Sequence, residues 1–89
     1  MIQIQKRILV VEDDFSVLKM MKFRLEHEGF SVFVADNGEK ALEEIALNRP
    51  IDLILMDVKM PGLDGYAVCR RLKEQSYTAR IPVIIMSGT

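Results

Sequence analysis

The sequence has little of what builds a disulfide framework, a membrane span or a nucleic-acid interface. Cys69 is the only cysteine, so it has no intramolecular partner and a cysteine-based zinc cluster is excluded. Twelve basic and thirteen acidic residues give a net charge of −1, whereas a nucleic-acid partner requires a basic surface. The longest aliphatic runs, such as Ile8–Val11, are too short to cross a bilayer. We therefore expect a cytoplasmic chain that binds neither nucleic acid nor membrane.

Short apolar runs alternate with segments of helical periodicity. The runs at 7–11, 51–56 and 81–86, and a weaker one at 30–35, are typical of parallel strands covered on both faces. Between the runs, apolar residues recur at helical spacing in three groups: Phe15, Leu18, Met21 and Leu25; Ala41, Leu42, Ile45 and Ala46; and Tyr66, Val68, Cys69 and Leu72. This order predicts one α/β domain over residues 1–89, with helices on both faces of a doubly wound parallel sheet.

Capping residues mark the ends of the first two expected helices. Asp14 or Ser16 can cap the start of the first helix, and Gly29 can end it. Asp36, followed three residues later by Glu39, has the spacing of a capping box for the second helix.

Residues able to do chemistry follow three of the expected strands. Glu12 and Asp13 follow the first strand, Asp57 follows the run at 51–56, and Ser87 follows the last run. Ligands of open α/β sheets bind beyond the carboxyl ends of the strands, so these side chains converge if their strands are neighbours. Clustered carboxylates repel one another unless a cation neutralises them, and oxygen ligands that share a site with a phosphate suit Mg²⁺. A carboxylate beside Mg²⁺ can attack phosphorus and form an aspartyl phosphate.

Each of these residues also has a plainer interpretation. An acidic residue after a strand is commonly a helix cap or a solvated loop residue, and Ser87 by itself is an ordinary loop hydroxyl. Their joint position at three strand ends is what favours a phosphate-binding metal site. No glycine-rich loop follows the first strand, which argues against nucleotide binding.

Three longer segments point to a known family. They are Ile8–Asp14, Asp52–Gly65 and Pro82–Gly88. They resemble, in that order, the first strand with its acidic pair, the phosphoacceptor strand and loop, and the switch-hydroxyl strand of the receiver domains of bacterial two-component response regulators. The resemblance covers nearly the whole chain and implies a flavodoxin-like (CheY-like) sheet. In that sheet the strands in chain order would lie side by side as 2-1-3-4.

The resemblance implies a signalling phosphoacceptor rather than an enzyme. Asp57 would accept a phosphoryl group from the phosphohistidine of a histidine kinase or phosphotransfer protein. Mg²⁺ would be held by Asp13 and Asp57, by Glu12 directly or through water, and by the backbone carbonyl of Lys59. Ser87 would turn its hydroxyl toward the phosphoryl group and so switch partner binding or self-association.

The sequence departs from the family pattern at its C-terminal end. The fourth helix, fifth strand and fifth helix of the family have no counterpart after Ser87, nor does the lysine that pairs with the acceptor carboxylate. We therefore expect a C-terminally incomplete receiver domain. The run at 81–86 would then form an exposed edge and join two copies, edge to edge or by segment exchange, into a homodimer.

Two other functions stay open. A receiver-like protein-interaction module would not be productively phosphorylated, because the family's lysine is missing. A phosphatase with an aspartate nucleophile would need a second aspartate two residues after Asp57, and position 59 is a lysine. An Asp57→Asn substitution separates the phosphoacceptor from the interaction module, because it abolishes acyl-phosphate formation and leaves simple partner binding unchanged.

Overall fold

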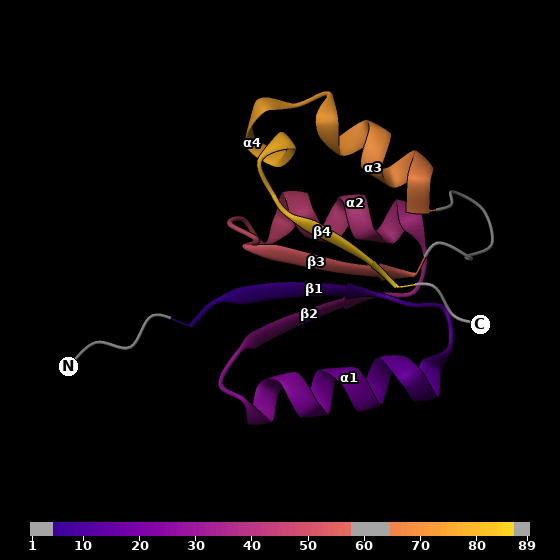
Figure 1. The fold of residues 1–89 in the computed structure, drawn as a ribbon, viewed down its shortest axis with the longest axis vertical. Coiled ribbons are helices and arrows are strands. Elements are labelled where there is room, and N and C mark those ends of the chain that lie inside the picture. Colours follow the sequence, from indigo (N-terminus) through magenta and orange to yellow (C-terminus); the bar gives the residue numbers. More distant parts are fainter. Residues whose placement is uncertain (1–4, 58–64, 87–89) are drawn as a thin grey trace.

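A parallel sheet forms the centre of the computed structural model, which describes residues 5–57 and 65–86 (Figure 1). Its strand order is β2-β1-β3-β4, and every neighbouring pair is parallel, as predicted. The expected strands are present, although three of them begin one or two residues later than predicted. Their bounds are β1 (Arg7–Val11), β2 (Ser31–Ala35), β3 (Leu53–Asp57) and β4 (Val83–Met86).

Helices cover both faces of this sheet, which confirms the doubly wound arrangement. In Figure 1, α1 (Phe15–His27) lies on one side of the strands, and α2 (Gly38–Leu47) and α3 (Gly65–Lys73) lie on the other. A short helix that the sequence did not predict, α4 (Ser76–Ala79), connects α3 to β4. None of the described helices is long and apolar enough to cross a membrane.

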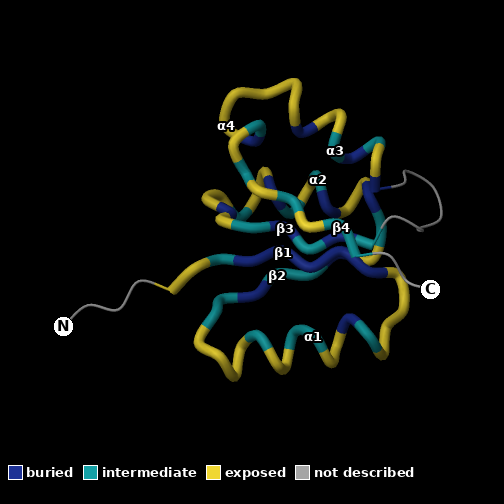
Figure 2. The backbone as a smooth tube through the Cα atoms, in the orientation of Figure 1, coloured by how far each residue is buried: buried dark blue, intermediate teal, exposed yellow. Residues whose placement is uncertain are grey.

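The core consists of two apolar layers, one on each face of the sheet. In Figure 2 the buried residues lie along the strands and at intervals along the helices. Along β1, Leu9 and Val11 belong to the layer beneath α2 and α3, whereas Ile8 and Val10 belong to the layer beneath α1. All four are almost fully buried, as the unbroken apolar run predicted. The helices contribute apolar side chains at helical spacing: Leu18, Met21 and Leu25 from α1, Ala41 and Ile45 from α2, and Val68 and Leu72 from α3.

The helix caps agree with the prediction for α1 but not for α2. The Asp14 carboxylate caps α1 by accepting hydrogen bonds from the backbone N–H groups of Ser16 (2.9 Å) and Val17 (3.2 Å). Gly29 follows the end of α1 with a φ of 98°, which favours glycine. The cap of α2 is Asn37, whose side chain accepts from the Lys40 N–H at 2.8 Å, so the prediction of Asp36 was wrong.

Three side chains expected to face the core are exposed. Phe15 and Tyr66 are 75% and 60% exposed, and both lie in the first turn of a helix, at the edge where the strands have ended. Ala46 is also exposed, near the end of α2. In β4, where burial on both faces was expected, Ile84 is 51% exposed. Periodicity identifies the side of a helix that faces the sheet, but it does not show where the sheet ends beneath it.

Candidate metal centre

The order of the strands brings two acidic chain segments to the same edge of the sheet. β1 and β3 are direct neighbours, and their register pairs Val11 with Met56. Glu12 and Asp57, the next residues along each strand, therefore lie side by side at the carboxyl edge. The Glu12 N–H donates to the Ala35 carbonyl of β2 at 3.0 Å, which fixes the backbone where β1 ends.

Glu12, Asp13 and Asp57 form a compact group of carboxylates. One oxygen from each residue lies within 4.8 Å of the others. Their exposure is graded: Glu12 is buried, Asp57 is half-buried and Asp13 is exposed to solvent. Such a group offers oxygen ligands of the kind that Mg²⁺ prefers, with one side open to water and to a phosphoryl group. The structure thus brings together the three carboxylates that the sequence identified as candidate ligands.

The electrostatics of the group are set by its most buried member. Burial raises the pKa of the Glu12 carboxyl, and the hydrogen bond with Asp13 and the negative charges of Asp57 and Asp13 raise it as well. The Asp14 N–H, which donates to Glu12 Oε2 at 3.0 Å, acts in the opposite direction. Burial and the two neighbouring carboxylates both make the ionised form of Glu12 less favourable. A bound divalent cation would favour that form.

The two other predicted site residues, Lys59 and Ser87, lie outside the described residues. The last residue of β4, Met86, is paired in register with Asp57. The described part of β4 thus ends beside the candidate phosphoacceptor.

A small cavity of about 200 Å³ adjoins the carboxylate group and shares Asp13 with it. It is lined by apolar residues and by Asp36 and Lys40, of which sequence reasoning considered Asp36 only as a helix cap and did not consider Lys40. Asp36 lies next to Asp13 because β2 is paired with β1, in a register that matches Ala35 with Val11.

Comparison with known proteins identifies a family for the chain. Residues 8–89 match the family model of the response regulator receiver domain. The alkaline phosphatase synthesis transcriptional regulatory protein PhoP of Bacillus subtilis is 37% identical over 83 residues, which are 93% of this chain and 33% of that protein. The response regulator PleD of Caulobacter vibrioides is 42% identical over 82 residues, which are 92% of this chain and 18% of that protein. The chain therefore spans a third or less of these curated relatives.

Solved structures give the same result for the fold. The chemotaxis protein CheY4 of Vibrio cholerae superposes with a TM-score of 0.87 at 28% identity, over 92% of this chain and 68% of that one. The signal receiver domain of a signal transduction histidine kinase from Syntrophus aciditrophicus gives a TM-score of 0.84 at 43% identity, over 91% of this chain and 61% of that one.

Proposed function

This chain belongs to the response regulator receiver domain family, and we propose that it is a phosphoacceptor of two-component signalling, with Asp57 as the acceptor. The observation that carries this proposal is the group of carboxylates, in which a half-buried Asp57 lies within 4.8 Å of Glu12 and Asp13 at the carboxyl edge of the sheet. The family is one of signalling domains, and its members are not enzymes in the usual sense. The usual setting of response regulators, the cytoplasm, is the one we propose here.

In the proposed reaction, an oxygen of the Asp57 carboxylate attacks the phosphorus of a phosphohistidine. An O–P bond forms while the N–P bond to the partner's imidazole breaks, and the imidazole nitrogen leaves with the electron pair. Glu12, Asp13 and Asp57, together with the carbonyl of Lys59, would hold Mg²⁺, which neutralises the carboxylates and the transferring phosphoryl oxygens. Because Asp13 is exposed, this side of the site is open to a phosphodonor.

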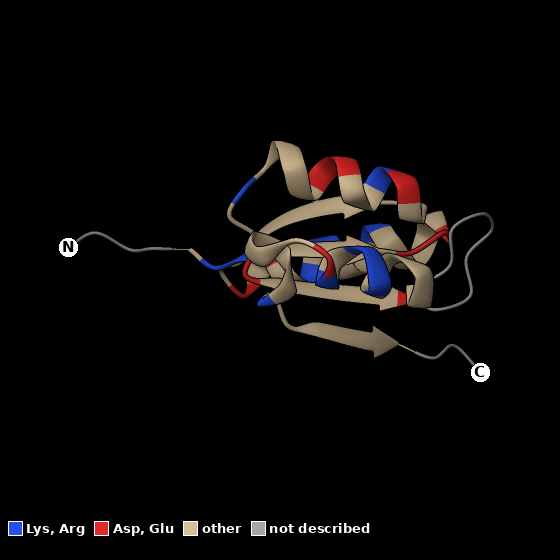
Figure 3. Cartoon of the chain, turned by 90° about the horizontal axis from the view of Figure 1, so that it is seen from above, with Lys and Arg blue, Asp and Glu red and all other residues tan. Residues whose placement is uncertain are grey.

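The proposed partners are a histidine kinase or a phosphotransfer protein and, for the 89-residue chain, a second copy. Figure 3 shows β4 as a strand without charged residues at one edge of the molecule. In the described part of the sheet, β4 has a strand neighbour on one side only. Charged side chains are one of the features that keep edge strands from pairing, and β4 has none. In this proposal, Ser87 follows β4 and turns its hydroxyl toward the phosphoryl group, which links phosphorylation to self-association.

The test of phosphoacceptor function is the intact mass of the chain after incubation with acetyl phosphate, with and without Mg²⁺. We expect a Mg²⁺-dependent gain of one phosphoryl group, and no gain in the Asp57→Asn variant. Glu43→Gln, which changes an exposed carboxylate on α2, is the matched control and should gain the group normally. A gain that persists in Asp57→Asn would contradict the assignment of the acceptor. No gain in a sample that circular dichroism shows to be folded would favour the protein-interaction module.

A further inference from the structure

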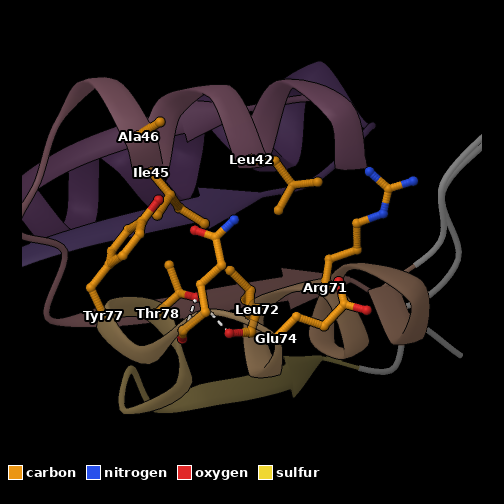
Figure 4. Close-up of a pocket in the computed structure, with 9 residues that line it drawn as sticks. Leu42, Ile45, Ala46, Arg71, Leu72, Glu74, Tyr77 and Thr78 are labelled. Atoms are coloured by element: carbon orange, nitrogen blue, oxygen red, sulfur yellow. Dashed lines mark hydrogen bonds between the residues drawn. The ribbon is translucent and has the colours of Figure 1, made fainter.

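Two hollows lie on the side of the sheet that carries α2, α3 and α4, and neither shares a residue with the carboxylate group. Figure 4 shows the first of them. The first, of about 420 Å³, lies between α2 and the chain that runs from α3 into α4. The second, of about 520 Å³, lies against residues 49–51 and Ile81. Both are lined by Ile45 and Tyr77, so they meet at these two side chains. We call the pair the α2–α3 groove.

Apolar residues line a large part of each hollow, together with polar and charged ones. The apolar lining residues are Leu42, Ile45, Ala46 and Leu72 in the first hollow and Ile45, Ile51 and Ile81 in the second. Thr78 also lines the first hollow, but its hydroxyl already donates to the Leu72 carbonyl. Each hollow has the size of a small-molecule site, for which volumes of about 300–1,000 Å³ are typical. The groove therefore suits a ligand with an apolar body.

The charged residues of the groove are mostly basic. Arg49 and Arg71 line it, against one carboxylate, that of Glu74. Figure 4 shows Tyr77 facing Ile45 at one end of the first hollow and Arg71 at the other. In the part of the chain that the structure describes, the salt bridge observed is Lys22–Glu26 on α1, so neither arginine is paired with a described carboxylate.

The exposed Arg49 side chain contacts the ring of Tyr77. Its guanidinium carbon lies 3.9 Å from the centre of the ring of Tyr77, a residue that lines both hollows, and Arg49 itself lines the second hollow. A guanidinium stacked by its face keeps its N–H edge available for a planar acceptor, and a carboxylate can accept two parallel hydrogen bonds from that edge. Because the stacking already restrains the side chain, less conformational entropy is lost on binding.

We propose that the α2–α3 groove binds a small amphiphilic carboxylic acid. Its carboxylate binds the Arg49 guanidinium, and its apolar body lies against Tyr77 and Ile45 in the hollows. Each hollow is of small-molecule size, which favours a small acid over a polypeptide segment. The proposal is independent of phosphorylation at Asp57, so the failure of one does not imply the failure of the other.

The test is an NMR titration of the ¹⁵N-labelled 89-residue chain with octanoate as the probe. We expect saturable shift changes centred on Ile45, Tyr77 and the residues that line the hollows. Arg49→Gln should weaken binding about fivefold or more, because a charge-assisted hydrogen bond is lost. Arg70→Gln is the matched control, since Arg70 is exposed on α3 and does not line the groove, and it should change the affinity less than twofold. Glu74→Gln should tighten binding, because it removes the repelling carboxylate.

Two further arms test the apolar body and the charge separately. Octanamide, which has the same chain without the charge, should bind at least about fivefold more weakly than octanoate. Ala46→Phe places a larger side chain in the first hollow and should also weaken octanoate binding. The proposal is overturned if octanamide binds as tightly as octanoate, or if Arg49→Gln and Arg70→Gln behave alike. It is equally overturned if the shifts lie outside the groove, or if octanoate produces none in the folded chain.

Discussion

Glu12 is the buried member of the carboxylate group. Burial, and then the neighbouring carboxylates, raise its pKa in the folded chain. At a pH below the ordinary glutamate pKa, the group is protonated in both the folded and the unfolded chain. As the pH rises through the window between the ordinary and the raised pKa, the unfolded chain releases its proton first. The free energy of unfolding therefore falls across this window and stays lower above it.

We therefore expect Glu12→Gln to stabilise the metal-free chain at neutral pH. The amide removes the buried charge and can still accept the hydrogen bond from the Asp14 N–H. A gain of about 1 kcal/mol would raise the melting temperature by about 4–8 °C in a domain of this size. Thermal unfolding followed by circular dichroism at pH 4 and at pH 8 measures this gain, which should be small at the lower pH.

The same variant tests whether Glu12 contributes to metal binding. MgCl₂ should raise the melting temperature of the unmodified chain at neutral pH, because binding to the folded state stabilises it. In Glu12→Gln this increase should be reduced, whereas in the exposed control Glu43→Gln it should be unchanged. If Glu12→Gln is destabilised at neutral pH or keeps the full Mg²⁺ effect, this account of Glu12 is wrong.

At the scale of the elements, Arg7 of β1 is hydrogen-bonded to the connection between α2 and β3. Its Nε donates to the Pro50 carbonyl at 2.7 Å and its Nη2 donates to the Asn48 carbonyl at 2.8 Å. Its backbone N–H donates to Asp52 Oδ2 at 2.8 Å, and its guanidinium lies over the Phe33 ring. The sequence identified Arg7 only as the first residue of a strand, because its hydrogen-bond partners are more than forty positions away.

Arg7→Ala should lower the free energy of unfolding by about 2 kcal/mol, because hydrogen bonds from a charged group are lost and two carbonyls are left without this donor. Arg7→Lys should recover less than half of this loss, since an ammonium group does not reproduce the planar fork. Urea unfolding measures both variants. Lys6→Ala, at an exposed neighbouring position, is the control and should be nearly neutral. Full recovery by lysine would show that charge alone accounts for the effect.

The start of α2 offers a second test at this scale, because the adjacent residues Asp36 and Asn37 are both candidate N-caps of the helix. Asn37→Ala should cost about 1 kcal/mol, because the Lys40 N–H loses its acceptor. Asp36→Ala should stay within about 0.5 kcal/mol, since among the described residues the Asp36 carboxylate accepts a hydrogen bond only from the exposed Asn37 amide. Urea unfolding of the two variants decides between them, and the reverse order of effects would restore the capping box predicted from the sequence.

These cases show which parts of the fold a sequence determines by itself. The strands and main helices could be predicted because burial on two faces, or along one stripe, leaves a regular apolar pattern. Glu12 and Asp57 could be predicted as neighbours because they end such strands. The Asn37 cap, the exposed Phe15 and the short helix α4 depend on where one element ends against another. That geometry leaves no periodic signal, so only the structure reveals it.

At the scale of the whole molecule, the two proposed binding regions lie on different parts of one framework. The carboxylate group forms where β1 and β3 end, so it depends on the strand order that the sequence predicted. The α2–α3 groove instead depends on α4, which carries Tyr77 to the side of α2. Since α4 was not predicted, the groove could not have been inferred from the sequence.

At the scale of the whole molecule, the exposure of β4 leads us to expect self-association. Because β4 is uncharged, lies at the edge of the described sheet and leaves Ile84 51% exposed, we expect the 89-residue chain to form a homodimer. Size-exclusion chromatography with light scattering measures this mass directly. Ile84→Lys should shift the chain to monomer, because pairing would place an ammonium group against an apolar strand.

Leu47→Lys is the matched control for the dimer, since Leu47 is 79% exposed but lies at the end of α2, away from β4. This variant should keep the dimer, which separates an effect at the strand edge from a general gain in solubility. If the unmodified chain elutes as a monomer at high concentration, pairing through β4 is excluded. If both lysine variants dissociate the dimer equally, exposed apolar area in general drives the association, because an edge-specific interface would respond only to the change in β4.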